Sequence, residues 1–226
     1  MKGQAVTTDS PTAAIPTPIP TPAPPPPAAP RGVLIGVGGD PLVVGLIFFG
    51  IASLALGMVL VGHPTGSQGA ILPILIVGAG LYQLVTTVWA ILLGQSLVAA
   101  IFSTFSAFWL SFGALLLGLG HGWFGIADTD APGAQELFFI AWACLFLLLT
   151  IPCLVLPVIY PLAVFLVFVA CALAACGAFT GSESLFTAAG ATALSFAFLA
   201  FYAWVRVARE SVGSKVLPPL GRPLVR

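Results

Sequence analysis

The chain has 226 residues, of which 59% are hydrophobic and 6% charged, with a net charge of zero and a mean hydropathy of +1.13. Positions 32 to 205 contain no Lys or Arg, whereas a water-soluble domain of this length needs charges of both signs on its surface. This composition excludes a soluble globular domain, and the lack of a basic patch along this stretch excludes a nucleic-acid-binding protein. It predicts an integral membrane protein with the lipid bilayer as its solvent.

The first 39 residues differ in composition from the rest of the chain. Ten of the twenty prolines lie between Pro11 and Pro30, and proline donates no backbone hydrogen bond to a helix or sheet. We therefore expect residues 1–39 to form a disordered cytoplasmic tail, and the lack of an apolar core segment before Ala29 argues against a signal peptide. Three roles are open for this tail: a stiff spacer, a dock for a proline-reading partner, or a solvated segment without further function.

Beyond Asp40 the apolar residues come in lengths that match a bilayer, at roughly 20 residues per helical span. The pattern predicts an all-α integral membrane protein whose six transmembrane helices form one bundle over residues 40–207. The predicted spans are residues 41–62, 69–93, 97–119, 134–154, 157–179 and 185–207. The fourth and fifth spans form one nearly continuous apolar run, and a turn between them is indicated by three prolines, Pro152, Pro157 and Pro161.

Two of the predicted spans carry stripes of small residues at helical spacing. In lipid, such stripes let two helix backbones approach closely, and close packing is what holds transmembrane helices together. The stripes predict a tight bundle and consist of Gly50, Ser53 and Gly57 in the first span and Ala189, Ala193 and Ala197 in the sixth.

Basic residues gather outside the spans. Lys2 and Arg31 precede the first span, and the end of the chain carries five more: Arg206, Arg209, Lys215, Arg222 and Arg226. Because Lys and Arg concentrate on the cytoplasmic side of membrane proteins, both termini are predicted to be cytoplasmic, with residues 208–226 as a basic tail. The predicted location is the cell (plasma) membrane, crossed an even number of times.

No ionisable side chain lies deep in a predicted span, since Asp40, Glu136 and Glu183 all fall at span ends. The spans also lack a carboxylate pair, a zinc-ligand spacing and a nucleophile with a nearby base. We therefore expect no enzymatic activity, metal site or cofactor. The four cysteines show neither metal-binding nor disulfide spacing and are interpreted as small buried hydrophobic residues.

Uncharged polar residues in the second and third spans are the main candidates for contact with a solute. Gln83 and Thr86 share one face of the second span because they are three residues apart, and the third span contains Ser103 and Ser106. Gln83 is the most costly of these residues to leave facing lipid. Two roles are open for it: a hydrogen bond between helices, or a donor that lines a path for a polar solute.

Aromatic residues crowd one side of the third span. Phe105, Phe108 and Phe112 follow helical spacing, and Trp109 lies beside them. Such a face either packs into a core or closes a narrow path as a hydrophobic gate. Spacing alone leaves both roles open.

The pair Asp40-Pro41 marks the start of the first span. Asp is a preferred N-cap residue and Pro a preferred first helical residue, so helix capping alone explains the pair. A helix N-terminus also attracts anions, although an ionised Asp40 works against an anion at this position.

Several segments agree, in order along the chain, with the landmarks of one family. Residues 39–49 contain Asp40-Pro41 followed by Gly45-Leu46, and residues 94–96 and 102–111 form a polar and aromatic run that ends Phe-Trp-Leu-Ser. Three further segments follow: residues 130–135, Trp142 and residues 177–181. Together they resemble the acetate uptake transporters, also called succinate-acetate permeases, whose first span carries Asn-Pro-Ala-Pro-Leu-Gly-Leu. The resemblance covers Gly39 to about Arg206.

The resemblance implies a six-helix protomer with its own substrate path, assembled as a hexamer, that moves acetate and related short-chain carboxylates with protons. The family's narrowest point is a Phe, a Leu and a Tyr, which correspond by position to Phe49, Val167 and Phe105. Combined with the polar and aromatic candidates, this gives an expected entrance and path formed by Asp40, Pro41, Gly45, Leu46, Gln83, Thr86, Ser103, Ser106 and Trp109.

Departures from the family pattern affect the expected solute. Asp40 replaces Asn, and a carboxylate there repels acetate unless it is protonated, so Asp40 either couples transport to protons or shifts preference toward a neutral or cationic solute. Phe105 lacks the hydroxyl of the family Tyr. Because no Lys or Arg lies between positions 32 and 205, selection depends on apolar constriction and neutral donors. The alternative function is a non-transporting membrane scaffold that presents the proline-rich tail to a partner.

Overall fold

The computed structural model describes residues 3, 38–63 and 68–225. The predicted disordered tail therefore falls almost wholly outside the described residues. Within them, six helical segments are long and apolar enough to cross a membrane, and the described chain forms no β-strand. These findings confirm the prediction of an all-α membrane protein with six transmembrane helices.

Five of the six crossings are single α-helices: α1 (Leu42–Leu60), α4 (Ser96–His121), α5 (Ala131–Cys153), α6 (Ile159–Thr180) and α7 (Glu183–Ser211). The second crossing, Ile71–Leu92, follows the 3₁₀ turn η1 (Gln68–Ala70) and is composite: it consists of α2 (Ile71–Pro73), the π-helix η2 (Ile74–Leu81) and α3 (Tyr82–Leu92). Two short 3₁₀ turns, η3 (Trp123–Gly125) and η4 (Asp128–Asp130), connect α4 to α5.

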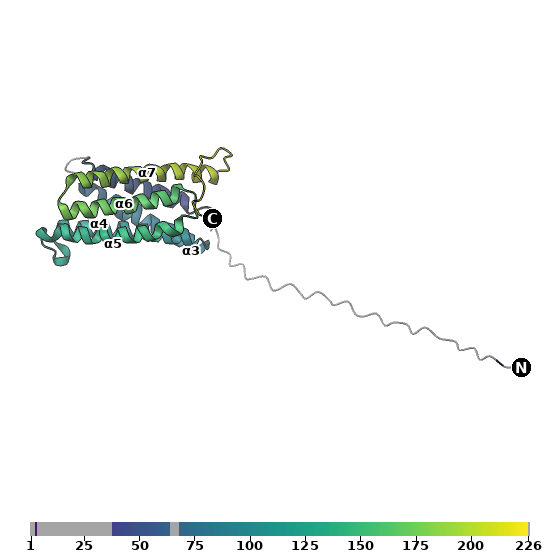
Figure 1. Ribbon diagram of the computed structural model, residues 1–226, viewed down its shortest axis with the longest axis horizontal. Helices are drawn as coiled ribbons and strands as arrows, with labels where there is room; N and C mark the ends of the chain where they lie inside the picture. The colour runs from purple at the N-terminus through teal and green to yellow at the C-terminus, as the bar shows by residue number, and fades with distance from the viewer. Residues whose placement is uncertain (1–2, 4–37, 64–67, 226) are drawn as a thin grey trace. The chain divides into compact units, whose positions relative to one another are not determined.

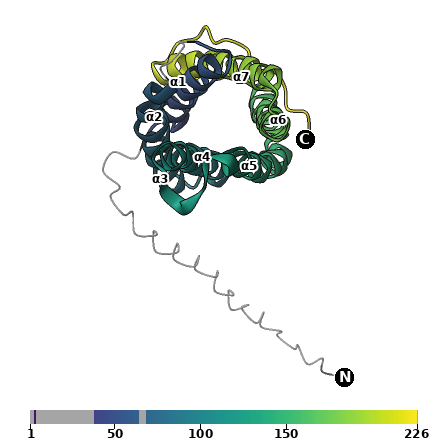
Figure 2. The same ribbon diagram turned by 90° about the vertical axis from the view of Figure 1, so that its left-hand side faces the viewer.

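The helices run up and down, side by side, along one axis (Figure 1). Viewed along that axis they stand in a ring, in which α7 closes back onto α1 (Figure 2). One end of the bundle, called the terminal end, holds the start of α1, the end of α7 and the turn from α5 to α6. The other end, called the loop end, holds the connections from α4 to α5 and from α6 to α7.

Close contact between α1 and α7 depends on glycine. A Cβ at Gly57 would lie 3.0 Å from the carbonyl oxygen of Gly190, and a Cβ at Gly190 would lie 2.7 Å from the Cβ of Leu60. The predicted small-residue stripes on these two helices are buried. The structure thus confirms the close helix packing that the stripes predict.

The π-helix in the second crossing has no signal in the sequence analysis. It spans eight residues and directly precedes the α-helix that carries Gln83. Its Gly80 carbonyl accepts a 2.7 Å hydrogen bond from the hydroxyl of Ser106 on α4. This bond holds the wide π-turns against the neighbouring helix, at a level of the bundle that also contains the aromatic face of α4.

The prediction that all four cysteines are buried is wrong for two of them. Cys153 and Cys171 are buried, whereas Cys144 and Cys176 are exposed on the outer surface of α5 and α6. In a membrane protein the outer surface also faces an apolar solvent, so an apolar sequence context does not distinguish the two environments.

Candidate functional site

Four phenylalanines from four helices meet in the middle of the bundle. The ring centroid of Phe49 on α1 lies 4.5 Å from that of Phe105 on α4 and 5.6 Å from that of Phe196 on α7. Phe105 in turn lies 5.1 Å from Phe146 on α5. All four side chains are buried, and together they form what we call the aromatic layer.

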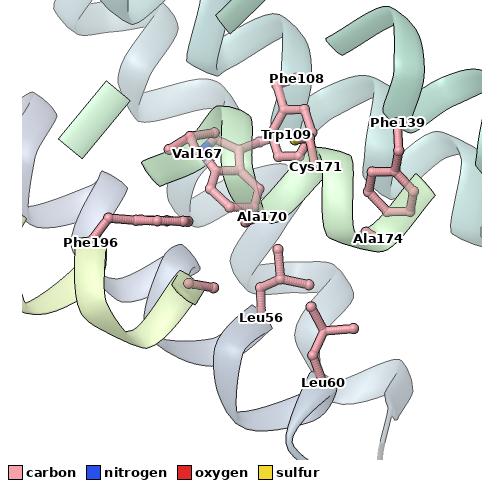
Figure 3. A pocket seen from close by; sticks show the side chains of 11 residues that line it. Leu56, Leu60, Phe108, Trp109, Phe139, Val167, Ala170, Cys171, Ala174 and Phe196 are labelled. Atoms are coloured by element: carbon pink, nitrogen blue, oxygen red, sulfur yellow. The ribbon is translucent and has the colours of Figure 1, made fainter. Parts of the chain in front are cut away.

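Next to the aromatic layer lies a small cavity of about 20 Å³, the narrow cavity (Figure 3). Val167 on α6 and Trp109 on α4 line it, as does Phe196 of the aromatic layer. Its volume accommodates about one water molecule. The structure therefore brings Phe49 and Phe105 into ring contact and places Val167 at the adjoining cavity.

A much larger cavity of about 880 Å³, the vestibule, opens at the loop end. It shares Leu56, Leu60 and Phe139 with the narrow cavity, so the two spaces adjoin. Its polar side chains are His121, Gln135, Glu183 and Thr187. From the loop end inward, the interior thus changes from a wide, partly polar vestibule to a narrow cavity and then to the aromatic layer.

Beyond the aromatic layer, toward the terminal end, lies a second packed group, called the mouth cluster. Its buried members are Leu46, Phe102, Ile159, Ala203 and Val207, against which Leu42, Val43, Val98, Tyr160, Leu199, Trp204 and Leu220 pack. Gly45 of the predicted entrance lies directly against the ring of Phe102, with no space for a Cβ.

Asp40 and Pro41 lie at the outer edge of the mouth cluster. The carboxylate of Asp40 accepts a 2.9 Å hydrogen bond from the backbone N–H of Leu42, which is the predicted capping interaction. Asp40 is half-buried, and this burial raises the pKa of its carboxyl above the ordinary value of 3.8, helped by the nearby Glu210 and opposed by the Leu42 hydrogen bond.

Polar side chains inside the bundle differ in how well they are satisfied. The hydroxyl of Thr86 donates to Tyr82 within its own helix, and that of Ser106 bridges to Gly80. In contrast, Gln83 is fully buried, and neither its amide oxygen nor its amide nitrogen has a hydrogen-bond partner among the described residues. The indole N–H of Trp109 is likewise buried without a described partner.

Two sequence-based expectations for these side chains differ from the structure. The interhelical hydrogen bond considered for Gln83 is not found among the described residues. Ser103 does not join the other candidates, because it is exposed on α4 and donates to the Ala100 carbonyl of its own helix. The described residues also contain no group of three His, Cys, Asp or Glu side chains placed to hold a metal ion.

Phe146 and Phe196 complete the aromatic layer but were missed by the sequence analysis. A signal for both was present. Phe196 lies between Ala193 and Ala197 on the small-residue stripe of α7, and Phe146 follows Phe139 by seven residues, a spacing that returns to the same helix face.

Residues 36–220 match the protein family described as GPR1/FUN34/yaaH, and the match extends over the whole six-helix bundle. The chain belongs to this family. Among solved structures, the chain is similar to the bacterial acetate channel SatP, with a TM-score of 0.71 and 27% sequence identity. The superposition covers 80% of this chain and 99% of the SatP chain.

Two relatives from Saccharomyces cerevisiae are similar to this GPR1/FUN34/yaaH member in sequence. One is named ammonia transport outward protein 2 and is 27% identical over 196 residues, which is 81% of this chain and 67% of the relative. The other is named accumulation of dyads protein 2 and is 27% identical over 174 residues, 72% of this chain. The chain spans only 59% of the length of the second relative.

Proposed function

We propose that this chain is a membrane transporter or channel for acetate and related short-chain carboxylates, and not an enzyme. The observation that carries the proposal is the narrowing of the interior inside one protomer, from the vestibule to the contact between Phe49 and Phe105. The similarity to SatP, which is titled an acetate channel, supports the same assignment.

We propose further that the solute passes the aromatic layer as the neutral, protonated acid, so that transport is linked to protons. The side chains that line the narrow cavity are apolar apart from the indole N–H of Trp109, and the chain has no Lys or Arg between positions 32 and 205. An unpaired carboxylate that enters such surroundings loses roughly several kcal/mol of hydration free energy, whereas the protonated acid loses far less.

The constriction proposed here consists of Phe49, Phe105 and Val167, joined by Phe146 and Phe196. Asp40, Pro41, Gly45 and Leu46 shape the terminal mouth, while Gln83 and Trp109 supply neutral hydrogen-bonding groups. In this proposal the terminal end faces the cytoplasm and the vestibule faces outward across the plasma membrane, in accord with the basic residues near the end of the chain. Assembly as a hexamer, with one path per protomer, remains a prediction from the family resemblance.

The direct test is uptake of labelled acetate into liposomes that contain the purified protein, with an inward proton gradient. We expect uptake above that of protein-free liposomes, and uptake equal to theirs would exclude the function. Because an uncharged, apolar path also suits ammonia, which one relative's name mentions, a parallel assay with an internal pH dye after an ammonia pulse tests that solute.

Replacing Gln83 with Leu is expected to stabilise the protein while reducing acetate transport. Leu has a similar volume and removes a buried amide that has no described hydrogen-bond partner, a gain of about 1–3 kcal/mol in the free energy of unfolding. If Gln83 instead serves packing alone, transport will be unchanged or will follow stability. Thermal unfolding in detergent and acetate uptake, measured on the same preparation, distinguish the two.

Replacing Asp40 with Asn is expected to remove one component of the pH dependence of uptake. Burial raises the pKa of Asp40, so the neutral, protonated form, which does not repel acetate, persists above pH 3.8. This form is lost as pH rises through the raised pKa. Asn still caps the helix and stays neutral. The ratio of wild-type to Asp40→Asn uptake should therefore be near one at acid pH and fall as pH rises. A ratio that is constant with pH contradicts a role for Asp40.

A further inference from the structure

The end of the described chain folds back onto the terminal end of the bundle. After α7 ends at Ser211, the chain turns at Gly213, whose φ is +74°, and residues 214–225 run back across the terminal end of the bundle (yellow, Figure 1). We call residues 214–225 the C-terminal strap. Its composition predicts only a basic tail, yet the strap is bonded to two separate parts of the bundle.

The first attachment of the strap is to α7. The hydroxyl of Tyr202 donates a 3.0 Å hydrogen bond to the carbonyl of Pro219, and Nη1 of Arg206 donates a 2.9 Å bond to the carbonyl of Pro218. Pro218 and Pro219 have no backbone N–H, so their carbonyls are the only backbone groups they contribute. Both are used.

The second attachment is to the turn between α5 and α6. The N–H groups of Leu224 and Val225 donate to the carbonyl of Leu154 at 3.1 and 3.2 Å, and the N–H of Ile159 donates to the carbonyl of Leu220 at 3.3 Å. Residues 154–158 of this turn are non-helical. The strap thus links the helix break between α5 and α6 to the last turns of α7.

Side-chain packing joins the strap to the mouth cluster. Leu220 packs against the cluster that contains Leu46 and Phe102. Next to it, Gly221 has a φ of +81° and lies so close to Val158 that a Cβ would collide with Cγ1 of that residue. On the proposed path, a solute that passes the aromatic layer toward the terminal end meets this cluster, against which Leu220 of the strap packs.

We propose that the C-terminal strap is a clasp that keeps the terminal mouth of the path closed, and that the mouth opens when the strap leaves the turn between α5 and α6. The inference rests on the proposed function, because it assigns a gate to the same path. Departure of the strap removes Leu220 from the mouth cluster and breaks the three backbone hydrogen bonds that join the strap to this turn.

The first test compares two glycine substitutions in the full chain. Gly221→Ala and Gly213→Ala place a Cβ at similar positive φ values, but only position 221 collides with a neighbour, since nothing lies within 4 Å at Gly213. The reporter is Leu46→Cys, labelled by a membrane-impermeant maleimide, with the four native cysteines replaced by Ala. We expect Gly221→Ala to raise labelling about tenfold, because loss of one ordinary contact shifts the equilibrium between closed and open mouth by about this factor. Gly213→Ala should leave labelling unchanged.

The second test locks the strap in place. A Cβ at position 221 lies 3.4 Å from the Cβ of Val158, close to disulfide distance, so Val158→Cys with Gly221→Cys in the same cysteine-free background forms a reversible cross-link. We expect acetate uptake to be lost when the pair is oxidised and restored by reductant. Val158→Cys alone should respond to neither treatment.

Uptake that is the same in the oxidised and reduced double-cysteine protein would overturn the clasp. Equal Leu46→Cys labelling in the two glycine variants would also overturn it, provided that tryptic cleavage after Lys215 shows the strap to be released in Gly221→Ala. Labelling requires no solute. If labelling rises with Gly221→Ala while no form of the protein takes up acetate, the clasp is supported and the proposed substrate is wrong.

Discussion

Replacing Phe49 with Ala is expected to abolish the preference for acetate over longer monocarboxylates. The Phe49 ring contacts both Phe105 and Phe196, with centroids 4.5 and 5.6 Å away, so its removal widens the aromatic layer where three helices meet. One methylene changes discrimination in an apolar pocket by roughly tenfold or more. We therefore expect the ratio of butyrate to acetate uptake to increase about tenfold.

The matched control for this substitution is Phe198→Ala. Phe198 is 65% exposed, whereas Phe196, two residues earlier on α7, belongs to the aromatic layer. Phe198→Ala should leave the uptake ratio unchanged, and Phe196→Ala should raise it as Phe49→Ala does. Competition of unlabelled butyrate and acetate against labelled acetate measures the ratio. An unchanged ratio in Phe49→Ala would exclude the aromatic layer as the size-selective point.

The number of crossings and the close packing of the helices could be predicted because they follow from local rules, whereas the pairing of α1 with α7 comes from the structure. Bilayer thickness fixes span length, and small residues at helical spacing, such as Gly57, allow a neighbouring backbone to approach closely. The π-helix could not be predicted in the same way. Its residues 74–81 are as apolar as those of an ordinary helix, and the Ser106 hydroxyl that bonds to Gly80 comes from another helix.

The candidate site was predictable only in part, because lipid and bundle interior are both apolar. Hydropathy does not tell an inward Phe from an outward one among 17, so Phe146 and Phe196 were not selected, and Ser103 was expected in the path although it is exposed. Phe49 and Phe105 were indicated by family position, and the structure brings their rings together. The strap escaped prediction because its bonds use backbone carbonyls, such as that of Pro219, which composition does not reveal.

Replacing Gly190 with Ala is expected to destabilise the bundle strongly. A Cβ at this position would lie 3.0 Å from the carbonyl oxygen of Gly57, 2.7 Å from the Cβ of Leu60 and 3.0 Å from the backbone carbonyl carbon of Leu60. None of these atoms can move by a change of rotamer, so α1 and α7 must separate. Overpacking of this kind costs about 1–3 kcal/mol, and in lipid the lost contact is the main force that holds the two helices together.

Gly120→Ala on α4 is the matched control for Gly190→Ala, since it also adds one methyl group to a helical glycine but has no atom within 4 Å of the new Cβ. Alanine favours a helix over glycine, so Gly120→Ala should unfold at the wild-type temperature or slightly above it. Gly190→Ala should unfold roughly 5 °C or more below, when both are followed by thermal unfolding in detergent. Equal unfolding temperatures would show that α1 and α7 are free to separate without loss of stability. Because the aromatic layer includes Phe49 of α1 and Phe196 of α7, separation of these helices is also expected to reduce acetate selectivity.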